Sequence, residues 1–86
     1  MNISREEQRV LHVLAQGGMI RHSRTAGGKL VEVLCVTHDG SVLADCTLGV
    51  VRRLRRKRLI ASRASAPYRI SDLGRRMVRA QTDNRV

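Results

Sequence analysis

The residues with the most evident chemistry are the cations between positions 52 and 58. Six of these seven residues are Arg or Lys, and Leu54 is the exception. A guanidinium group makes paired hydrogen bonds to a phosphate or a carboxylate, so such a run is typical of an anion-binding surface. Like charges three or four residues apart on a helix repel one another, which makes the run costly if it is only a solvated face. We therefore predict that this segment binds a partner.

The predicted binding surface combines the helix that carries the run with a hairpin that follows it. On a helical wheel most of these cations lie opposite the apolar side, which is formed by Leu48, Val50, Val51 and Leu54. Arg55 falls at the edge of that apolar side, and we expect it to have a more structural role. The predicted binding residues are Arg52, Arg53, Arg56, Lys57, Arg58, Arg63 and Arg69.

The charge of the whole chain indicates the same class of partner. Seventeen Lys and Arg residues against seven Asp and Glu give a net charge of +10 at pH 7. This charge favours a polyanion such as double-stranded DNA, or an acidic protein surface. No apolar run approaches the roughly 20 residues of a membrane span, and the N-terminus lacks the apolar region of a signal peptide. We therefore expect a cytoplasmic protein with no membrane partner.

Patterns for catalysis or metal binding are weak. No metal-ligand motif matches the spacing of His12, His22, His38, Cys35 and Cys46. The paired glycines match no nucleotide-binding loop. We predict no metal, no cofactor, no small-molecule substrate and no enzymatic activity. A ribonuclease is the less favoured alternative, because His, Glu and Arg side chains can supply general acid–base catalysis.

The first half of the chain predicts a helix and then a small antiparallel meander. Ser4 and Glu7 form a capping-box pattern at the start of a helix that Gly17-Gly18 ends. Three extended segments with glycine-containing turns between them follow, at 19–25, 30–37 and 41–44. The middle segment is rich in Val and Leu, so we expect a buried strand with Cys35 in the core, and a partly exposed Cys46 after the meander.

The second half predicts the basic helix and a hairpin. Asp45 or Thr47 can cap the helix, which should run to about Lys57. Short extended segments at 59–63 and 68–70 flank a small-residue turn, so they read as the two strands of a hairpin.

A last helix is predicted after the hairpin. Ser71 can cap it, and Leu73 and Met77 have helical spacing. Gly74 inside this helix costs about 1 kcal/mol relative to Ala. For Tyr68, just before it, we expect the ring to pack on the core and the hydroxyl to face water.

These elements predict a single α+β domain over residues 1–86, ordered helix, β meander, basic helix, β hairpin, helix. A basic helix followed by a hairpin and a short helix resembles the second half of a winged-helix domain. There the basic helix is the recognition helix and the 59–70 hairpin is the wing. A meander replaces the usual helix before the recognition helix, so we expect a variant winged-helix domain. A monomer is the default expectation, with the edge of the meander as the place where another copy could pair.

The whole chain also resembles a narrower family, the YjhX-type toxins. The resemblance is carried by short strings spread from the N-terminus to the C-terminus. These strings are Ile3-Ser4-Arg5, Glu7-Gln8-Arg9, Leu11-His12-Val13-Leu14-Ala15, Leu43-Ala44-Asp45-Cys46-Thr47-Leu48, Leu59-Ile60 with Ser62, Pro67-Tyr68-Arg69-Ile70, Val78-Arg79-Ala80-Gln81 and Asp83-Asn84-Arg85. The helix after Thr47 is richer in arginine than the resemblance leads us to expect.

The resemblance implies a small bacterial toxin of a toxin–antitoxin pair that inhibits DNA topoisomerase I. It also implies a cognate antitoxin as a second partner. The alternative reading from the residues is a winged-helix transcriptional regulator with the 47–58 helix in the major groove of DNA. The sequence does not separate binding to DNA from binding to the topoisomerase.

Overall fold

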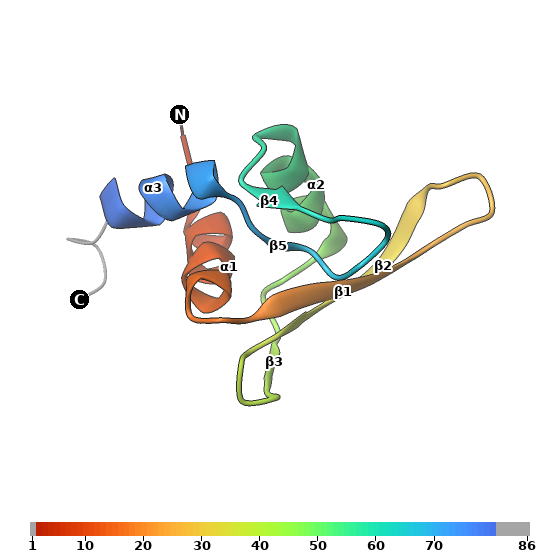
Figure 1. Cartoon of the computed structure of the whole chain (residues 1–86), viewed down its shortest axis with the longest axis horizontal. Helices are drawn as coiled ribbons and strands as arrows, with labels where there is room; N and C mark the ends of the chain where they lie inside the picture. The colour runs from red at the N-terminus through yellow and green to blue at the C-terminus, as the bar shows by residue number, and fades with distance from the viewer. Residues whose placement is uncertain (1, 81–86) are drawn as a thin grey trace.

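The computed structural model describes residues 2–80 and confirms the predicted α+β class (Figure 1). Its helices are α1 (Arg5–Ala15), α2 (Leu48–Arg56) and α3 (Asp72–Ala80). Its strands are β1 (Met19–Arg24), β2 (Leu30–Val36), β3 (Val42–Leu43), β4 (Ile60–Ala61) and β5 (Arg69–Ile70). Within residues 2–80, no helix is long and apolar enough to cross a lipid bilayer.

Helix α1 begins at the predicted capping box. The Ser4 N–H donates to Glu7 Oε1 at 2.7 Å, and the Glu7 N–H donates to Ser4 Oγ at 3.1 Å. These two bonds satisfy backbone donors that the first turn of a helix leaves without partners. The buried apolar side of α1 is formed by Val10, Leu11 and Leu14. This capped and anchored helix fixes Glu7 in the interior, where it meets the basic run.

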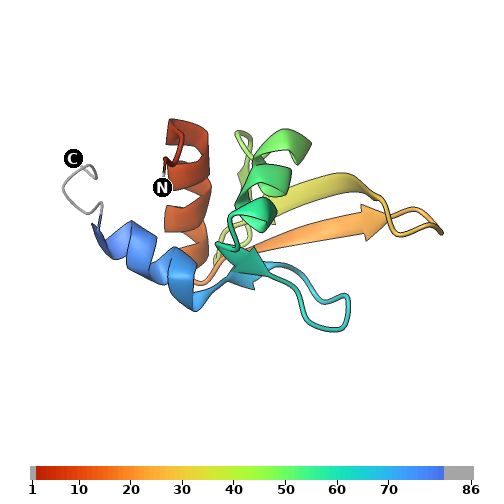
Figure 2. The same cartoon turned by 90° about the horizontal axis from the view of Figure 1, so that it is seen from above.

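Strands β1, β2 and β3 form an antiparallel sheet in that order. Strands β1 and β2 make a ribbon that extends away from the helices (Figure 2). The prediction of a buried strand at 30–37 is wrong for most of β2, because only one face of this sheet is covered. Leu30 and Cys35 are buried, whereas Val31 and Leu34 are 42% and 44% exposed. An antiparallel strand with one open face therefore replaces the fully buried strand we expected.

The second sheet is the hairpin of β4 and β5, which corresponds to the wing. Ile60 pairs with Ile70, and Ala61 pairs with Arg69. A single bridge between Ile20 and Tyr68 joins this hairpin to β1, with N–H to oxygen distances of 3.0 and 2.8 Å. The strand after the first helix is thus joined to the chain that enters the second wing strand, which is compatible with a winged-helix-like fold. The ribbon and β3 occupy the place of the helix that usually precedes the recognition helix.

Helix α3 is capped by Ser71, whose Oγ accepts from the Gly74 N–H at 3.0 Å and donates to Arg58 O at 2.7 Å. The sequence suggested only that Gly74 is a weak helix former. The structure shows that its missing side chain is also needed for packing. A Cβ atom at this position would lie 2.3 Å from Leu59 O. The missing side chain is what lets α3 pack against the chain that enters β4.

The core contains both cysteines and the tyrosine. Cys35 is fully buried as predicted, and Cys46 is 9% exposed, less than the partly exposed position we expected. The Tyr68 ring packs in the core with the residue only 3% exposed. Its hydroxyl accepts a hydrogen bond from Arg24 Nη2 instead of facing water alone. Tyr68 therefore joins the end of β1, at Arg24, to the wing.

Candidate anion-binding surface

Helix α2 presents the basic run because its other side is fixed in the core. Thr47 is its N-cap, and Thr47 Oγ1 accepts from the Val50 N–H at 3.3 Å. Asp45, the other predicted cap, instead pairs with Arg9 on α1. Val50, Val51 and Leu54 are buried, as the helical wheel predicted. Arg52, which lies between them in the sequence, is exposed.

The C-terminal end of α2 has a specific geometry that turns Arg58 outward. The Leu59 N–H donates to Leu54 O and the Arg58 N–H donates to Arg55 O, each at 3.0 Å. This pair of bonds is a Schellman motif, and Leu54 and Leu59 make the buried apolar contact that accompanies it. The motif needs a left-handed residue, and here Arg58 adopts it with φ of 62°. Glycine is the usual residue at this position, so arginine is held there at a conformational cost.

Two cations of the run are used inside the protein. Lys57 Nζ lies 2.9 Å from both carboxylate oxygens of Glu7 and donates to Asn2 O at 2.6 Å. Arg53 Nε lies 3.7 Å from Glu7 Oε2. Both cations are half-buried, and Glu7 is 1% exposed. Lys57 and Arg53 were predicted on an outward stripe, but the structure directs them to α1.

The pKa of Glu7 reflects this environment. Burial alone would raise the pKa of the carboxyl. The hydrogen bond from the Ser4 N–H and the Lys57 ammonium outweigh burial, so the pKa lies below its ordinary value of 4.5. Glu7 is therefore ionised at neutral pH and holds part of the basic run against α1.

The remaining arginines of α2 and of the wing tip are exposed. The side chains of Arg56, Arg58 and Arg63 make no hydrogen bond or ion pair with any of residues 2–80. Arg52 has a long hydrogen bond of 3.4 Å from Nη2 to Leu30 O. We use the term arginine surface for the exposed members of this group, which are Arg52, Arg55, Arg56, Arg58 and Arg63.

Arg55 belongs to a cluster that the sequence did not reveal. Its guanidinium carbon lies 5.8 Å from the centre of the Tyr68 ring, within range of a cation–π contact. The His22 ring lies on the same tyrosine, with 4.7 Å between ring centres. Arg24 and Arg55 line a cleft of about 380 Å³ between α2, the wing and the end of β1. Arg24 is more than 40 positions from Tyr68, so no local pattern could have placed it here.

The wing turn is tight and strained. The Ala66 N–H donates to Arg63 O at 2.9 Å, and the two residues between them have φ of 51° (Ala64) and 64° (Ser65). Two left-handed central residues define a type I′ turn, which normally takes Asn-Gly. Strained backbone of this kind concentrates at functional sites. The turn and Arg58 both carry such strain, and both adjoin exposed arginines.

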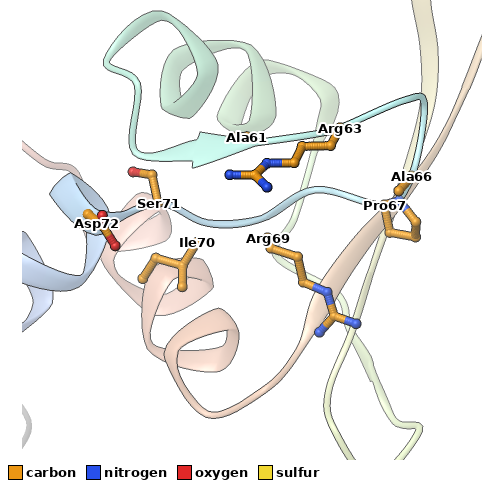
Figure 3. A pocket seen from close by; sticks show the side chains of 8 residues that line it. All are labelled: Ala61, Arg63, Ala66, Pro67, Arg69, Ile70, Ser71 and Asp72. Carbon is orange, nitrogen blue, oxygen red and sulfur yellow. The ribbon is translucent and has the colours of Figure 1, made fainter.

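Beside this turn the wing forms an open hollow of about 560 Å³ (Figure 3). The Arg63 side chain lies along β4 toward Ala61 and borders the hollow. Arg69 points away from Arg63, toward the α1–β1 connection, where its Nη1 donates to Gly17 O at 3.2 Å and Gly18 O at 3.3 Å. Arg69 is exposed but partly satisfied, so Arg63 is the freer cation of the wing.

Groups for covalent or metal chemistry are not gathered at this surface. No three His, Cys, Asp or Glu side chains among residues 2–80 are close enough to hold a metal ion. The hydrogen bond with Cys35, together with burial, raises the pKa of the Cys46 thiol. A buried thiol with a raised pKa is a poor nucleophile. The chemistry that the surface offers is the binding of anions by guanidinium groups.

Comparison with known proteins gives the same family over nearly the full chain. A family model described as "putative toxin of bacterial toxin-antitoxin pair", that of the YjhX toxins, matches residues 1–85. A UPF0386 protein of Beijerinckia indica is 72% identical over 85 residues, covering 99% of this chain and 100% of the relative. A UPF0386 protein of Rhodospirillum rubrum is 64% identical over 84 residues, covering 98% and 93%. One from Ruegeria is 60% identical over 85 residues, covering 99% and 100%. No solved structure matches the chain.

The family match agrees with the resemblance read from the sequence strings. It also implies an antitoxin as a partner of the protein. On these grounds, the chain belongs to the YjhX toxin family, the toxins of bacterial toxin–antitoxin pairs.

Proposed function

We propose that this toxin inhibits DNA topoisomerase I by binding through the arginine surface. The observation that carries the proposal is the set of exposed guanidinium groups at Arg56, Arg58 and Arg63, which have no acidic partner within residues 2–80. A surface that needs an external anion suits an enzyme whose substrate is a polyanion. The choice of enzyme comes from the family resemblance.

Inhibition by this route requires the surface to occupy either an acidic region of the enzyme or the DNA that the enzyme holds. Guanidinium groups bind phosphate and carboxylate with the same paired geometry, so the arginine surface suits both. Arg58 lies in the turn that ends α2, and Arg63 lies at the tip of the wing. A partner that spans α2 and the wing would contact both, together with Arg56.

The direct test is relaxation of supercoiled plasmid by purified DNA topoisomerase I in the presence of the toxin. We expect the rate of relaxation to fall as the toxin is added, and immobilised toxin to retain the enzyme. Full relaxation at saturating toxin, with no retention of the enzyme, would overturn the proposal.

A second candidate function is direct binding to double-stranded DNA. Helix α2 has the position of a recognition helix, and Arg52, Arg55 and Arg56 lie on its exposed side. Affinity for duplex DNA should then fall with salt, with a logarithmic slope of about −0.9 for each phosphate neutralised. Gel shifts over a salt series measure this slope. Inhibition of the topoisomerase by a toxin that gives no gel shift would favour the enzyme as the direct target.

We further propose that the protein acts by binding and has no catalytic activity of its own. Incubation of the toxin with labelled RNA tests this point, since a ribonuclease is the alternative. Intact RNA is the expected outcome. Cleavage that co-purifies with the toxin and is lost on substitution of His12, His22 or His38 would contradict the proposal.

The antitoxin is proposed to neutralise the toxin by covering the arginine surface with an acidic face. Antitoxin and topoisomerase should then compete for the toxin. Retention assays with both proteins check this. Simultaneous binding of antitoxin and enzyme to one toxin would show that the antitoxin uses another face.

A further inference from the structure

The outer face of the three-stranded sheet carries exposed apolar side chains, and none of the helices within residues 2–80 covers it. The large hydrophobic side chains that are exposed within residues 2–80 are Val31 (42%), Leu34 (44%) and Val42 (57%). Leu34 on β2 and Val42 on β3 lie on the open face, whereas Val31 falls where the β1–β2 register is irregular. Figure 1 shows the three helices above the β1–β2 ribbon. Apolar side chains gathered on one open face mark an interaction surface.

The strand register defines the two faces of the sheet. Cys35 pairs with Ile20 on one side and with Leu43 on the other, and all three pack in or against the core. Neighbouring residues on a strand point to opposite faces, so the pairs that flank this row point away from the core. The outer face is therefore formed by Met19, Arg21, Ser23, Glu32, Leu34, Val36 and Val42.

The charges on this face differ from those on the rest of the molecule. Arg21 and Glu32 are its only ionic groups among those seven residues, so the face is neutral in a chain of net charge +10. Neither has an ionic partner within the described part of the chain, and Glu32 accepts a hydrogen bond from Ser23 Oγ at 2.9 Å. An acidic partner would be drawn to the arginine surface, whereas a neutral apolar face fits another neutral apolar face.

We propose that this face is the interface of a homodimer in which two sheets pack face to face. The two-fold axis of this dimer would lie midway between the two sheets, parallel to the strands and centred over the space between β1 and β2. It lays β1 of one copy over β2 of the other, so Met19 faces Val36 of the second copy. The same axis lays Arg21 of one copy over Leu34 of the second copy, one position along this face from Glu32. Because the axis is two-fold, this arrangement occurs twice in the dimer. The face thus carries its own complementary charges.

The dimer leaves the functional surface accessible. The arginine surface belongs to α2 and the wing, which lie on the other side of the sheet (Figure 1). A dimer would therefore present two arginine surfaces directed outward. The inference depends only on the sheet face and stands apart from any activity of the toxin.

The face is small for an interface. Three short strands offer a contact near the lower limit of about 1,000 Å² that specific interfaces exceed. We therefore expect a dimer that dissociates on dilution in the micromolar range and not a permanent one. Sedimentation equilibrium over micromolar to near-millimolar concentrations should show twice the chain mass of 9.6 kDa at the high end. A wild-type mass of one chain at every concentration would overturn the proposal.

Substitutions on the face provide the sharper test. L34E introduces a charge at the centre of the patch and should keep the protein monomeric. Leu34 is 44% exposed, so the fold should tolerate this change. R76E on the exposed side of α3 is the matched control and should dimerise like the wild type. Circular dichroism checks that both variants are folded, and an L34E variant that is folded and still dimeric would contradict the interface.

Charge exchange tests the predicted pairing of Arg21 with Glu32 of the second copy. R21E alone places two glutamates in contact across the axis, and E32R alone places two arginines in contact. Each variant should dimerise about tenfold more weakly than the wild type. An equal mixture of the two should form a heterodimer, because both contacts then join a glutamate to an arginine. If the folded variants dimerise like the wild type, or the mixture stays monomeric, the assignment of this face is wrong.

Discussion

At the scale of single residues, Glu7 decides which cations of the basic run are free to bind a partner. It is buried, and it accepts from Lys57 Nζ at 2.9 Å while Arg53 lies close by. A buried carboxylate needs such partners, because an unpaired charge in the interior is strongly unfavourable. Two of the run's cations therefore serve the fold. The dense charge that the sequence displays is partly structural and partly a binding surface.

The first prediction concerns the pH dependence of stability. Because the pKa of Glu7 is lowered by folding, the unfolded chain binds the proton more tightly near the ordinary value of 4.5. The stabilisation from Glu7 is therefore present above this pH and is lost as the pH falls through the lower pKa of the folded state. Urea unfolding from pH 7 to pH 3 should show this loss. E7Q should be less stable than the wild type at pH 7 by about 2 kcal/mol and should lose less on acidification.

Asp39 supplies a control for that measurement. Its carboxyl also has a lowered pKa, because the Thr37 hydroxyl donates a hydrogen bond to it, but Asp39 is exposed in a turn. D39N should therefore change the pH dependence less than E7Q. If the two substitutions change the pH dependence of the free energy of unfolding equally, the buried ion pair contributes no more to it than the exposed turn.

The second prediction concerns Arg58 and separates stability from binding. Glycine adopts the left-handed conformation freely, so R58G should raise the free energy of unfolding by about 1 kcal/mol. The same change removes a guanidinium group from the arginine surface and should weaken partner binding. Chemical denaturation and a binding assay measure the two effects. A variant that is more stable and binds equally well would remove Arg58 from the proposed surface.

At the scale of elements, the wing and α3 are positioned by close backbone contacts that side-chain patterns do not reveal. The bridge from Ile20 to Tyr68 joins the wing to the first sheet. The turn at Ala64 and Ser65 closes the wing with two left-handed residues. Gly74 allows α3 to approach the carbonyl of Leu59. Each contact fixes one edge of the surface that carries Arg58 and Arg63.

The third prediction concerns the strain in the wing turn. Asn-Gly is the preferred pair for a type I′ turn, because both residues tolerate positive φ. The double variant A64N/S65G should therefore be more stable than the wild type by about 1 to 2 kcal/mol. Thermal and urea unfolding measure the difference. No gain, or a loss, would mean that the turn does not have the conformation described.

The fourth prediction compares two helical glycines. G74A should destabilise the protein by more than 1 kcal/mol, roughly, because the new Cβ would lie 2.3 Å from Leu59 O. G49A on α2 is the matched control, since its nearest contact would be a side-chain atom of Arg53 at 3.6 Å. Helix propensity then predicts a gain of up to about 1 kcal/mol for G49A. Gains for both variants would contradict the packing of α3 against the entrance to β4.

At the scale of the whole molecule, local patterns predicted most of the elements but not the contacts between them. The capping box at Ser4, the Thr47 cap and the wing hairpin all follow from neighbouring residues, and the structure confirms them. The pairing of Lys57 with Glu7 spans 50 positions, and no local periodicity encodes it. The open face of β2 was also missed, because its mixture of Val and Leu resembles a buried strand when the covering layers are unknown.

The assembled fold separates two kinds of surface. The arginine surface lies on α2 and the wing, and the neutral apolar face lies on the other side of the β1–β2–β3 sheet. The net charge of +10 is not spread evenly over the molecule. Glu7 neutralises part of the basic run in the interior, and the charges on the apolar face sum to zero. The first surface is proposed to bind the topoisomerase, and the second a further copy of the chain.

We expect the arginine surface, and not the overall charge, to be responsible for inhibition. Plasmid relaxation by DNA topoisomerase I should be compared for two variants of equal net charge. One is R56A/R58A/R63A on the arginine surface, and the other is R5A/R76A/R79A at exposed positions of α1 and α3. We expect the first variant to lose inhibition by at least tenfold, roughly, since each charged contact contributes on the order of 1 kcal/mol or more, while the second should inhibit like the wild type. Equal inhibition by the two variants would contradict this expectation.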